Sequence, residues 1–513
     1  MKNSATAITN DIILELKNID KWFGNVHAND SVSIKINKSS IHGIIGENGA
    51  GKSTLMSIVY GYYQADNGKI LVNGKEVSIN SPVQALNHGI GMVHQHFMLV
   101  EPFTVLENII LGAETGTILE NSLKSARSEL KRLEENYSLD VDPDAIVGEL
   151  PVGIRQRVEI LKALYRGANI FILDEPTGVL TPQEVEHLFK ILKSLKDQGK
   201  TIILITHKLR EIMDLTDNVT VMRQGKVVSN KPTKKTNKEE LAELMVGRSV
   251  LLRVDKKENN IGKKILSVKN LSILDEKDLV KVKNISFDIN QGEIVGIAGV
   301  AGNGQTELLE ALTGIRKIKD GSIEFLKNKY DNTHHINAKK IRKYGLAHVP
   351  EDRQRMGLVT TFSASESGIL GYQDLKLYNG KFLFKKRSIL KNMFEKFNRF
   401  DVRPSNPLLK TSSFSGGNQQ KIVLVREMDQ EPELLVVGQP TRGVDIGAIE
   451  FIHKQLVSLR DKGKAILLVS VELDEILSLS DKILVMFNGE IVGEMKTENA
   501  DEKTLGLLMA GVK

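Results

Sequence analysis

The sequence contains no cysteine, and it contains no apolar run of the roughly 18–20 residues that a helix needs to cross a bilayer. Without cysteine there are no disulfides, no thiolate metal sites and no cysteine nucleophile, which fits a reducing compartment. The opening residues, Met1 to Asn10, are polar and do not resemble a signal peptide. We therefore expect a protein of the cytosol or of a membrane surface.

The charge balance is only moderately basic, with 70 Lys and Arg against 64 Asp and Glu, a formal net charge of +6. Many lysines fall within residues 226–264, and such a surface can attract nucleic acid or anionic lipid. The arginine–aromatic interleaving typical of single-strand binders is absent there. We favour a solvated lysine-rich face and expect no nucleic acid partner.

A glycine-rich loop follows an apolar, strand-like run at Ile41–Ile45 and precedes a helix-like stretch at Thr54–Tyr60. It matches the pattern G-x-x-x-x-G-K-[ST], in which backbone N–H groups surround phosphates. The lysine reaches the outer phosphates and the serine hydroxyl faces Mg²⁺. The predicted nucleotide-binding residues here are Gly46, Glu47, Asn48, Gly49, Ala50, Gly51, Lys52, Ser53 and Thr54.

Two carboxylates, Asp174 and Glu175, close a predicted buried strand at residues 170–173. An acidic pair can simply cap a helix. Because this pair follows a phosphate loop, and because Thr206-His207 closes the next strand, we assign it to phosphoryl transfer. In that chemistry Asp174 holds Mg²⁺ and Glu175 polarises the attacking water.

Two further residues are candidates for the same site. Gln95 follows a predicted strand and is a candidate Mg²⁺ and water contact, whereas its neighbours His94 and His96 show no further ligand cluster. Phe23 precedes the phosphate loop by the length of a β-hairpin and is a candidate to stack on adenine. The alternative for Phe23 is a half-buried strand aromatic.

The chain repeats itself. Lys52 aligns with Gln305, and Gln95 aligns with Glu351. Three further aligned pairs are Gly153 with Gly417, Asp174 with Gly438, and His207 with Val471. The second half carries extra residues between its phosphate loop and Gly417, which we place in loops. We predict a first domain at 1–248, a polar linker at 249–264 and a second domain at 265–513.

Each half is predicted to be α/β. The strands at Ile170–Leu173, Thr201–Ile205, Leu434–Val437 and Ala465–Val469 are apolar throughout, as in buried parallel sheets. Residues 122–137 carry apolar side chains at helical spacing. We therefore expect a parallel-sheet core with a β-rich opening and an inserted helical subdomain in each half.

A second anion site is predicted where Ser415, Gly416 and Gly417 open a helix. A serine with paired glycines at a helix N-terminus suits a γ-phosphate from outside its own domain. The aligned helix of the first half begins with Pro151 and Val152, so the serine and one glycine are missing there.

These motifs, with residues 91–108 (Gly-Met-Val-His-Gln-His-Phe-Met-Leu-Val-Glu-Pro-Phe-Thr-Val-Leu-Glu-Asn) and 157–165 (Arg-Val-Glu-Ile-Leu-Lys-Ala-Leu-Tyr), resemble the ATPase subunits of ABC importers with two fused nucleotide-binding domains. The resemblance is to the ribose, galactose and nucleoside type, and most to the nucleoside-uptake members. It covers nearly the whole chain. It implies two tandem ABC-type P-loop NTPase domains, each with a parallel-sheet core, an antiparallel β subdomain and a helical subdomain.

The resemblance also implies two ATP sites, each shared between the phosphate loop of one domain and the signature helix of the other. One site is then complete, and its residues are Phe23, Lys52, Ser53, Gln95, Asp174, Glu175 and His207, with Ser415, Gly416, Gly417 and Asp445. The other is degenerate, with Gln305, Thr306, Glu351, Gly438, Gln439 and Val471 set against Pro151 and Val152.

We therefore expect an ATPase that uses ATP and Mg²⁺ to drive solute import at the cytoplasmic face of the cell membrane. Its expected partners are two membrane permease subunits and, through them, an extracytoplasmic solute-binding lipoprotein. Nucleosides are the first candidate solute, and ribose or galactosides the second. The rivals are a soluble paired-ABC protein acting on ribosomes or DNA, and a non-catalytic nucleotide-sensing scaffold. The first usually keeps both sites complete, and the intact Glu175 and His207 speak against the second.

Overall fold

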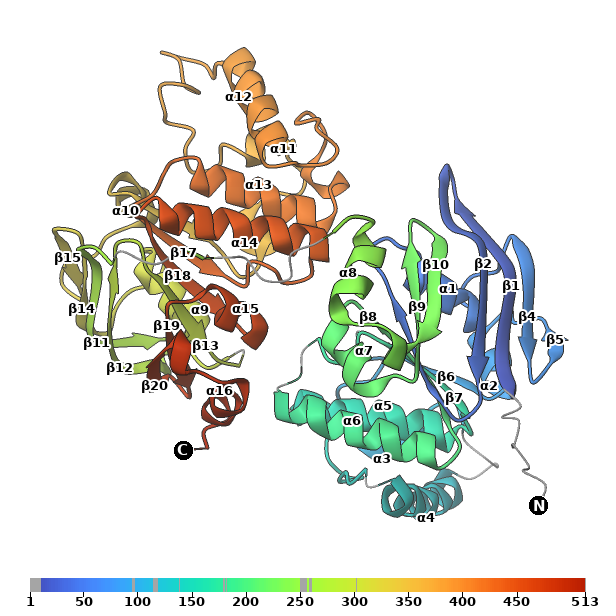
Figure 1. Cartoon of the computed structure of the whole chain (residues 1–513). Coiled ribbons are helices and arrows are strands. Elements are labelled where there is room, and N and C mark those ends of the chain that lie inside the picture. Colours follow the sequence, from blue (N-terminus) through green and yellow to red (C-terminus); the bar gives the residue numbers. More distant parts are fainter. Residues whose placement is uncertain are drawn as a thin grey trace, which may run out of the picture. The chain divides into compact units, whose positions relative to one another are not determined.

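The computed structural model describes residues 11–94, 97–113, 119–137, 139–178, 180, 182–249, 256–257, 261–300 and 302–512 (Figure 1). The chain divides into two compact units, Met1–Val250 and Leu251–Lys513. Each unit contains a four-stranded antiparallel sheet, a six-stranded mostly parallel sheet and a set of helices. Among the described residues, no helix is both long and apolar enough to cross a membrane.

The first unit opens on its antiparallel sheet, in the order β2-β1-β4-β5. The six-stranded sheet follows in the order β10-β9-β3-β8-β7-β6, in which only β10 is antiparallel to its neighbour. The strands are β1 (Ile12–Phe23), β2 (Val26–Asn37), β3 (Ile41–Ile45), β4 (Asn67–Val72), β5 (Lys75–Val77), β6 (Ile90–Val93), β7 (Ile170–Asp174), β8 (Thr201–Thr206), β9 (Asn218–Arg223) and β10 (Lys226–Pro232).

The helices of the first unit cover these sheets and form an inserted layer between β6 and β7. They are α1 (Lys52–Val59), α2 (Pro82–Asn87), α3 (Val105–Ile110), α4 (Leu119–Tyr137), α5 (Val152–Tyr165), α6 (Pro182–Asp197), α7 (Leu209–Leu215) and α8 (Lys238–Val246), with 3₁₀ turns at Val147–Glu149 and Thr233–Lys235. The pairs α3–α5, α3–α4 and α4–α5 are in contact, which makes these three helices the inserted helical subdomain.

The second unit repeats this plan, with sheets β12-β11-β14-β15 and β16-β17-β18-β13-β19-β20. Its strands are β11 (Lys264–Leu274), β12 (Val280–Asn290), β13 (Ile294–Ala298), β14 (Asp320–Phe325), β15 (Asn328–Asp331), β16 (Leu346–Val349), β17 (Leu434–Gly438), β18 (Ala465–Ser470), β19 (Lys482–Phe487) and β20 (Glu490–Lys496). Its helices are α9 (Gln305–Leu312), α10 (Ala338–Lys343), α11 (Ala364–Ser367), α12 (Lys386–Arg399), α13 (Gly416–Met428), α14 (Ile446–Asp461), α15 (Leu473–Leu479) and α16 (Glu502–Met509). Short 3₁₀ turns lie at Thr411–Ser413 and Thr497–Asn499, and a π-helical turn at Arg353–Gly357.

The central strands are buried on both faces because helices or the second sheet cover each side. Every residue of β3, β8, β17 and β18 is buried, as their continuous apolar sequences predict. In the first unit β8 lies between β3 and β7, and all three run in the same direction. Their carboxyl ends therefore meet along one edge of the sheet, where Ile45 pairs with Thr206 and Asp174 with Ile205.

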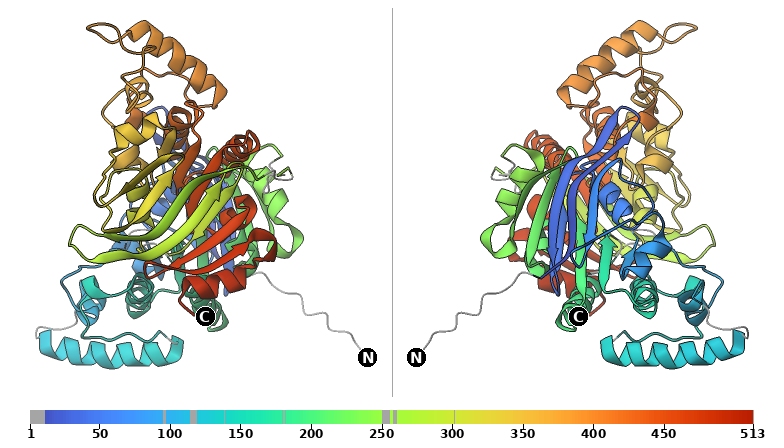
Figure 2. Two further views of the ribbon diagram at one scale, coloured as in Figure 1. Left: turned by 90° about the vertical axis from the view of Figure 1, so that its left-hand side faces the viewer. Right: turned by 90° about the vertical axis from the view of Figure 1, so that its right-hand side faces the viewer.

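Most of the extra residues of the second half lie after Glu351, in its helical subdomain. The connection between α11 and α12 is longer than the one between α3 and α4. In Figures 1 and 2, α12 and this connection project from the second unit, with α13 and α14 between α12 and the six-stranded sheet. The expectation that the extra residues form loops holds for the connection, but the turn at Arg353–Gly357 is helical.

Most of the predicted linker at 249–264 lies outside the described residues, which within it are 249, 256, 257 and 261–264. Lys256 is in place against the second unit, where its Nζ donates to the backbone oxygens of Leu479 and Ser480. Burial lowers the pKa of Lys256.

Candidate functional site

The loop after β3 has a backbone shape that only its glycines allow. Gly49 and Gly51 have φ angles of 83° and 93°, in the left-handed region. A Cβ at Gly51 would lie 2.3 Å from the backbone oxygen of Ala28, and one at Gly46 would lie 2.3 Å from that of Met222. The loop is therefore packed against β2 and β9.

Lys52 is the first residue of α1 and is 6% exposed. Its Nζ donates to the backbone oxygens of Gly46 and Glu47, at 2.8 and 3.0 Å. Burial lowers the pKa of Lys52, against the opposing pull of Glu175 and Asp174. The Lys52 ammonium is thus held across the loop by two of its backbone oxygens.

Asp174 and Glu175 lie at the carboxyl end of β7, directly beside the ends of β3 and β8. Ser53 Oγ donates to Asp174 Oδ1 at 3.5 Å, so the two predicted Mg²⁺ ligands face each other. Burial raises the pKa of Asp174. A hydroxyl and a carboxylate are hard oxygen ligands, and this pair fits the ligand preference of Mg²⁺.

Glu175 has a φ of 47°, which is uncommon for a residue with a side chain. Its N–H donates to the backbone oxygen of Ile205 at 2.9 Å, which holds the turn against β8. At the end of the same strand His207 Nδ1 lies 2.9 Å from Glu175 Oε1. The hydrogen bond from His207 lowers the pKa of Glu175 despite its burial. Glu175 is consequently held as an ionised, oriented carboxylate, as a water-polarising base requires.

Phe23 ends β1 and is 43% exposed, so part of its ring is accessible to a ligand. Tyr63 packs edge-on against its ring with a centroid distance of 5.2 Å. Sequence reasoning missed Tyr63, for which the only signal was an aromatic beyond α1. It also missed Asn29, whose Nδ2 donates to the backbone oxygen of Gly51 at 3.0 Å and tethers the loop.

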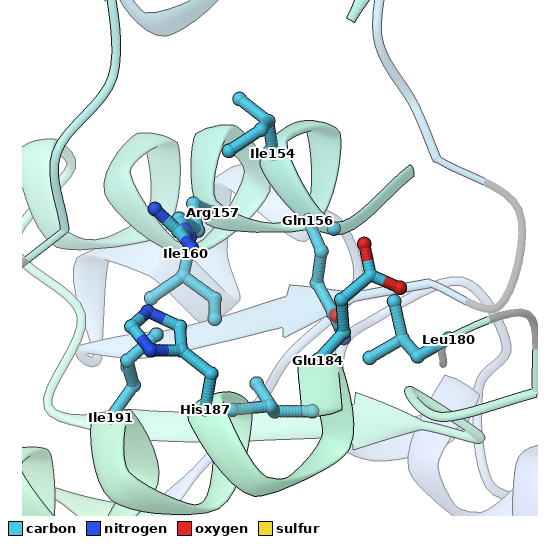
Figure 3. A pocket seen from close by; sticks show the side chains of 10 residues that line it. Ile154, Gln156, Arg157, Ile160, Leu180, Glu184, His187 and Ile191 are labelled. Carbon is cyan, nitrogen blue, oxygen red and sulfur yellow. The ribbon is translucent and has the colours of Figure 1, made fainter. Parts of the chain in front are cut away.

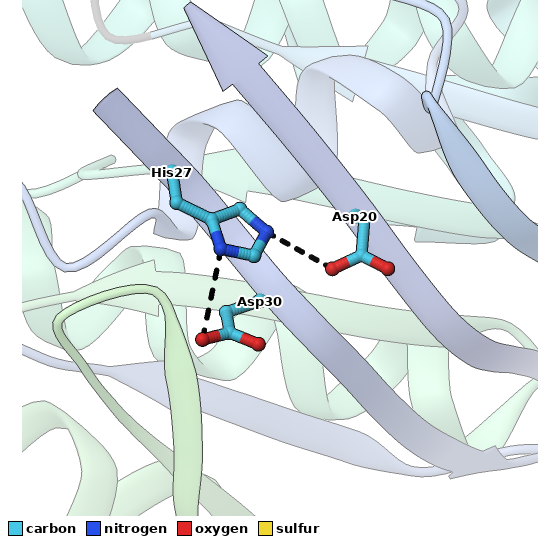
Figure 4. A group of neighbouring side chains, drawn as sticks. All are labelled: Asp20, His27 and Asp30. Carbon is cyan, nitrogen blue, oxygen red and sulfur yellow. Dashed lines mark hydrogen bonds and ion pairs between the residues drawn. The ribbon is translucent and has the colours of Figure 1, made fainter. Parts of the chain in front are cut away.

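The same hairpin holds Asp20, His27 and Asp30 close together (Figure 4). His27 Nε2 lies 3.0 Å from Asp20 Oδ1, and its Nδ1 lies 3.6 Å from Asp30 Oδ2. The Trp22 ring stacks on the His27 ring, at 4.0 Å between centroids. Lys226 Nζ lies 3.0 Å from Asp30 Oδ2. Because the ammonium and imidazole already partner these acids, we assign the group to bracing the hairpin.

Gln95 and His96 lie outside the described residues. Their neighbour His94 follows β6 and packs against Tyr60 and Tyr62, with ring centroids 5.9 and 5.6 Å away. Burial lowers the pKa of His94.

In the second unit the aligned positions form a different set of contacts. Gln305 begins α9, and its Nε2 donates to the loop oxygen of Val300 at 3.0 Å. Thr306 Oγ1 donates to Glu351 Oε2. In the first unit the aligned Ser53 donates instead to Asp174, at the end of β7. Burial raises the pKa of Glu351. The second loop therefore has the neutral Gln305 where the first has Lys52, and the Glu351 carboxylate lies against the Thr306 hydroxyl.

Gly438 provides the space for that carboxylate. A Cβ at Gly438 would lie 2.5 Å from Glu351 Cγ and 2.8 Å from Leu309 Cδ1. The two replacements, Gly438 for the acid and Glu351 for the glutamine, are therefore sterically coupled. This coupling could not be read from the sequence, because Gly438 ends β17 and Glu351 lies just beyond the end of β16, the neighbouring strand.

Gln439 keeps the backbone conformation of Glu175, with a φ of 47° and an N–H bond of 2.8 Å to Val469. Its side-chain oxygen accepts from the backbone N–H of Val471 at 3.3 Å, where the first unit has the carboxylate–imidazole pair. The second unit keeps the backbone conformation of this turn, but it has no carboxylate and no imidazole at these two positions.

The two signature positions also differ as the sequence predicts. Ser415 caps α13, and its Oγ accepts from Asn418 Nδ2 at 2.9 Å. Gly417 is buried, and a Cβ there would lie 3.2 Å from Asp445 Oδ2, so the helix start and the acid at the N-cap of α14 are in contact. In the first unit Pro151 is the N-cap of α5 and offers no side-chain cap, and Val152 is 36% exposed.

A small cavity of about 40 Å³ separates α5 from α6 near this point (Figure 3). Ile160 and Arg157 of α5 face His187 and Ile191 of α6 across it. Cavities that hold ligands of nucleotide size are about 300–1,000 Å³. We therefore attribute the cavity to imperfect helix packing.

The chain was compared with known proteins. The sequence profile described as ABC transporter matches residues 29–178 and 282–442, one match in each unit. The chain is 47% identical to the nucleoside import ATP-binding protein NupA of Lactococcus lactis, covering 98% of this chain and 99% of that protein. It is 46% identical to the guanosine import ATP-binding protein NupO of Bacillus subtilis, with 98% of both covered.

Two more distant likenesses complete the comparison. The galactose/methyl galactoside import ATP-binding protein MglA of Escherichia coli is 38% identical, with 98% of both chains covered. A solved complex of archaeal ribosomal stalk protein aP1 with ribosome recycling factor aABCE1 superposes with a TM-score of 0.63 over 93% of this chain and 90% of that chain. At 18% identity this last likeness concerns the fold alone.

Proposed function

The chain belongs to the ABC transporter family, and we propose that it is the ATP-hydrolysing subunit that energises nucleoside import through a separate membrane permease. One observation supports the proposal that this subunit hydrolyses ATP. Lys52, Asp174 and the Glu175–His207 pair all lie at one edge of the six-stranded sheet. The choice of nucleosides is supported by the higher identity to the nucleoside and guanosine importers, 47% and 46%, than to the galactoside importer, 38%.

A simple sugar is the second candidate solute. The relative MglA spans the same length of this chain as the nucleoside importers do. The side chains that select a solute belong to other subunits. Sequence identity between ATPase subunits is therefore only indirect support for a shared solute. A ribosome-acting protein is not favoured, because that likeness rests on fold at 18% identity.

We propose the following roles at the first phosphate loop. Glycine N–H groups of the loop and the ammonium of Lys52 hold the β- and γ-phosphates of ATP. Glu175 accepts the proton of the attacking water, and His207 keeps that carboxylate ionised and oriented. Ser53 and Asp174, with Gln95, would hold Mg²⁺, which neutralises charge that develops on the phosphate oxygens. Phe23, with Tyr63 against its edge, is proposed to stack on adenine.

We further propose that the first phosphate loop alone supports hydrolysis. The Gln305 amide carries no charge to hold phosphates, Gln439 cannot act as a base, and Val471 has no imidazole to orient a base. We assign Ser415, Gly416, Gly417 and Asp445 to the nucleotide of the first phosphate loop, and Pro151 and Val152 to the degenerate counterpart. This assignment extends the family resemblance to single residues.

The proposed partners are two permease subunits and an extracytoplasmic solute-binding protein, and the proposed location is the cytoplasmic face of the membrane. The test of the solute is uptake of radiolabelled nucleosides, ribose and galactose by cells with and without this gene. Loss of nucleoside uptake alone, restored by the wild-type gene but not by Glu175→Gln, supports the proposal. Loss of sugar uptake alone would replace nucleosides with sugars, and no change in any uptake would refute import.

A further inference from the structure

The connection that precedes α12 ends in a hairpin whose tip is apolar and exposed. Phe382, Leu383 and Phe384 are 86%, 81% and 53% exposed, and Phe382 and Leu383 are the two most exposed large hydrophobic side chains among the described residues. Asn379 and Phe384 form an antiparallel bridge, and the N–H of Gly380 donates to the backbone oxygen of Leu383 at 3.0 Å. The apolar tip is thus presented by a closed turn.

The base of this hairpin is anchored in the subdomain. Tyr378 is 1% exposed and packs in a cluster with Ile369, Ile389 and Met393. Its hydroxyl donates to Asn392 Oδ1 at 2.7 Å and accepts from Lys396 Nζ at 2.8 Å. The exposed apolar tip is therefore carried on a buried, hydrogen-bonded base.

The charged side chains within the segment that forms the tip are all cations. Residues 375–387 contain the cations Lys376, Lys381, Lys385, Lys386 and Arg387 and no aspartate or glutamate. The preceding acid, Asp374, is paired with Lys339 at 2.5 Å, away from the tip in sequence. Lys381 Nζ lies 5.6 Å above the ring of Phe382, so cations and apolar groups share one surface.

The aligned segment of the first half has a different composition. Residues 111–118, which stand at the aligned connection between α3 and α4, contain one acid and no lysine, arginine or aromatic residue. The tip is therefore a property of the second unit and not of the repeated fold.

We propose that residues 381–387, the basic apolar tip, insert into the interface of an anionic phospholipid bilayer. Aromatic and aliphatic side chains flanked by lysine and arginine are the composition that binds this boundary, because the rings enter the headgroup layer while the cations meet lipid phosphates. A protein partner that bound this tip would have to bring acidic groups and an apolar groove together. The bilayer surface supplies both properties without a specific sequence.

This contact goes beyond the proposed function, because it joins the chain directly to lipid without a permease. It would raise the local concentration of the ATPase at the membrane and orient the second unit before or during assembly. It uses none of the nucleotide-binding residues, so ATPase activity and lipid binding are separable.

The test is co-sedimentation of the full chain with vesicles. Phosphatidylcholine vesicles are compared with vesicles that contain about 30% phosphatidylserine, at low salt and at about 0.5 M salt. We expect binding only with the anionic lipid and loss of most binding at high salt. Phe382→Ser combined with Leu383→Ser should weaken binding about tenfold, as should Lys381→Gln combined with Lys386→Gln and Arg387→Gln.

The matched control is Leu279→Ser combined with Leu408→Ser, which removes two apolar side chains that are 59% and 61% exposed in the same unit. This control should bind as wild type, and all variants should keep wild-type unfolding temperatures. Equal binding to both kinds of vesicle, or full binding by the tip variants, would overturn the proposal. A tip variant that binds no vesicle differently but lowers ATP-driven uptake would assign the tip to a permease instead.

Discussion

At the scale of single residues, His207 influences the ionisation of Glu175, the proposed base. The imidazole donates a hydrogen bond to a partly buried carboxylate, and this bond opposes the effect of burial on the pKa. The second unit has the same backbone shape with Gln439 and Val471 in these positions. The chemistry of each half therefore depends on side chains, since the backbone is shared.

Glu175→Gln should cut ATP turnover about 10²–10⁴-fold and leave ATP binding in place, because an amide cannot take the proton of the attacking water. The measurement is phosphate release by the assembled transporter together with equilibrium nucleotide binding. Lys52→Ala, as the contrasting variant, should weaken binding as well. Near-normal turnover in Glu175→Gln would show that another group is the base.

His207→Ala should move the acidic limb of the pH–rate profile to higher pH. The bond from His207 lowers the pKa of Glu175, so the carboxylate stays ionised to lower pH in the wild type. Without the bond, burial is left to raise that pKa, and activity is lost earlier as the pH falls. The profile is measured as turnover from about pH 4 to 8, with His334→Ala as an exposed-histidine control. A limb that stays in place would contradict the coupling.

Gly438 and Glu351 should behave as a coupled pair. Gly438→Ala introduces a Cβ at 2.5 Å from Glu351 Cγ, so we expect a loss of about 1–3 kcal/mol of unfolding free energy, as for overpacked cores. Glu351→Ala in the same chain should recover part of that loss, measured by denaturant unfolding. Additive losses in the double variant would separate the two residues.

The same contact bears on any attempt to repair the second half. Gln305→Lys with Gly438→Asp and Gln439→Glu should hydrolyse ATP no faster than wild type, because the new aspartate collides with Glu351 and the imidazole is still missing. Groups that act together in catalysis are strongly non-additive. A doubled rate that survives Lys52→Ala would refute this account.

At the scale of elements, the start of a helix decides whether it can hold an anion. The helix α13 begins with a capping serine and two glycines, whereas α5 begins after a proline that has no N–H. Ser415→Arg should therefore abolish turnover, since a bulky cation fills the helix start, while Val152→Arg should have a much smaller effect. Phosphate release by both variants checks this. Equal losses would refute the assignment of one functional signature helix.

Strand order is the element-level feature that assembles the first site. The loop, the acid pair and the histidine come from three segments far apart in sequence, and they meet because β3, β8 and β7 are adjacent and parallel. Binding sites at the carboxyl ends of such strands are a general property of open α/β sheets.

At the scale of the whole molecule, two units of one architecture carry different side chains at aligned positions, such as Lys52 and Gln305. With Glu175→Gln to prevent turnover, we expect one tightly bound ATP per chain, because only one phosphate loop has a lysine. Equilibrium dialysis with labelled ATP measures the number, and Lys52→Ala should remove the tight class. Two equivalent sites per chain would show that Gln305 and Glu351 do not weaken binding.

The sequence by itself determined the phosphate loop, the acid pair, the repeat and the buried strands. These features depend on residues that are close in the chain: glycines that permit one loop shape, and apolar runs that only a covered sheet accommodates. The tertiary structure decided the contacts between segments that lie far apart in sequence. Only the tertiary structure shows that Thr306 bonds to Glu351 and that a side chain at Gly438 would collide with Glu351. It also shows that Tyr63 packs against Phe23 and that Phe382 is exposed. The physical reason is that strand order and packing bring these side chains together, and neither is encoded in local spacing.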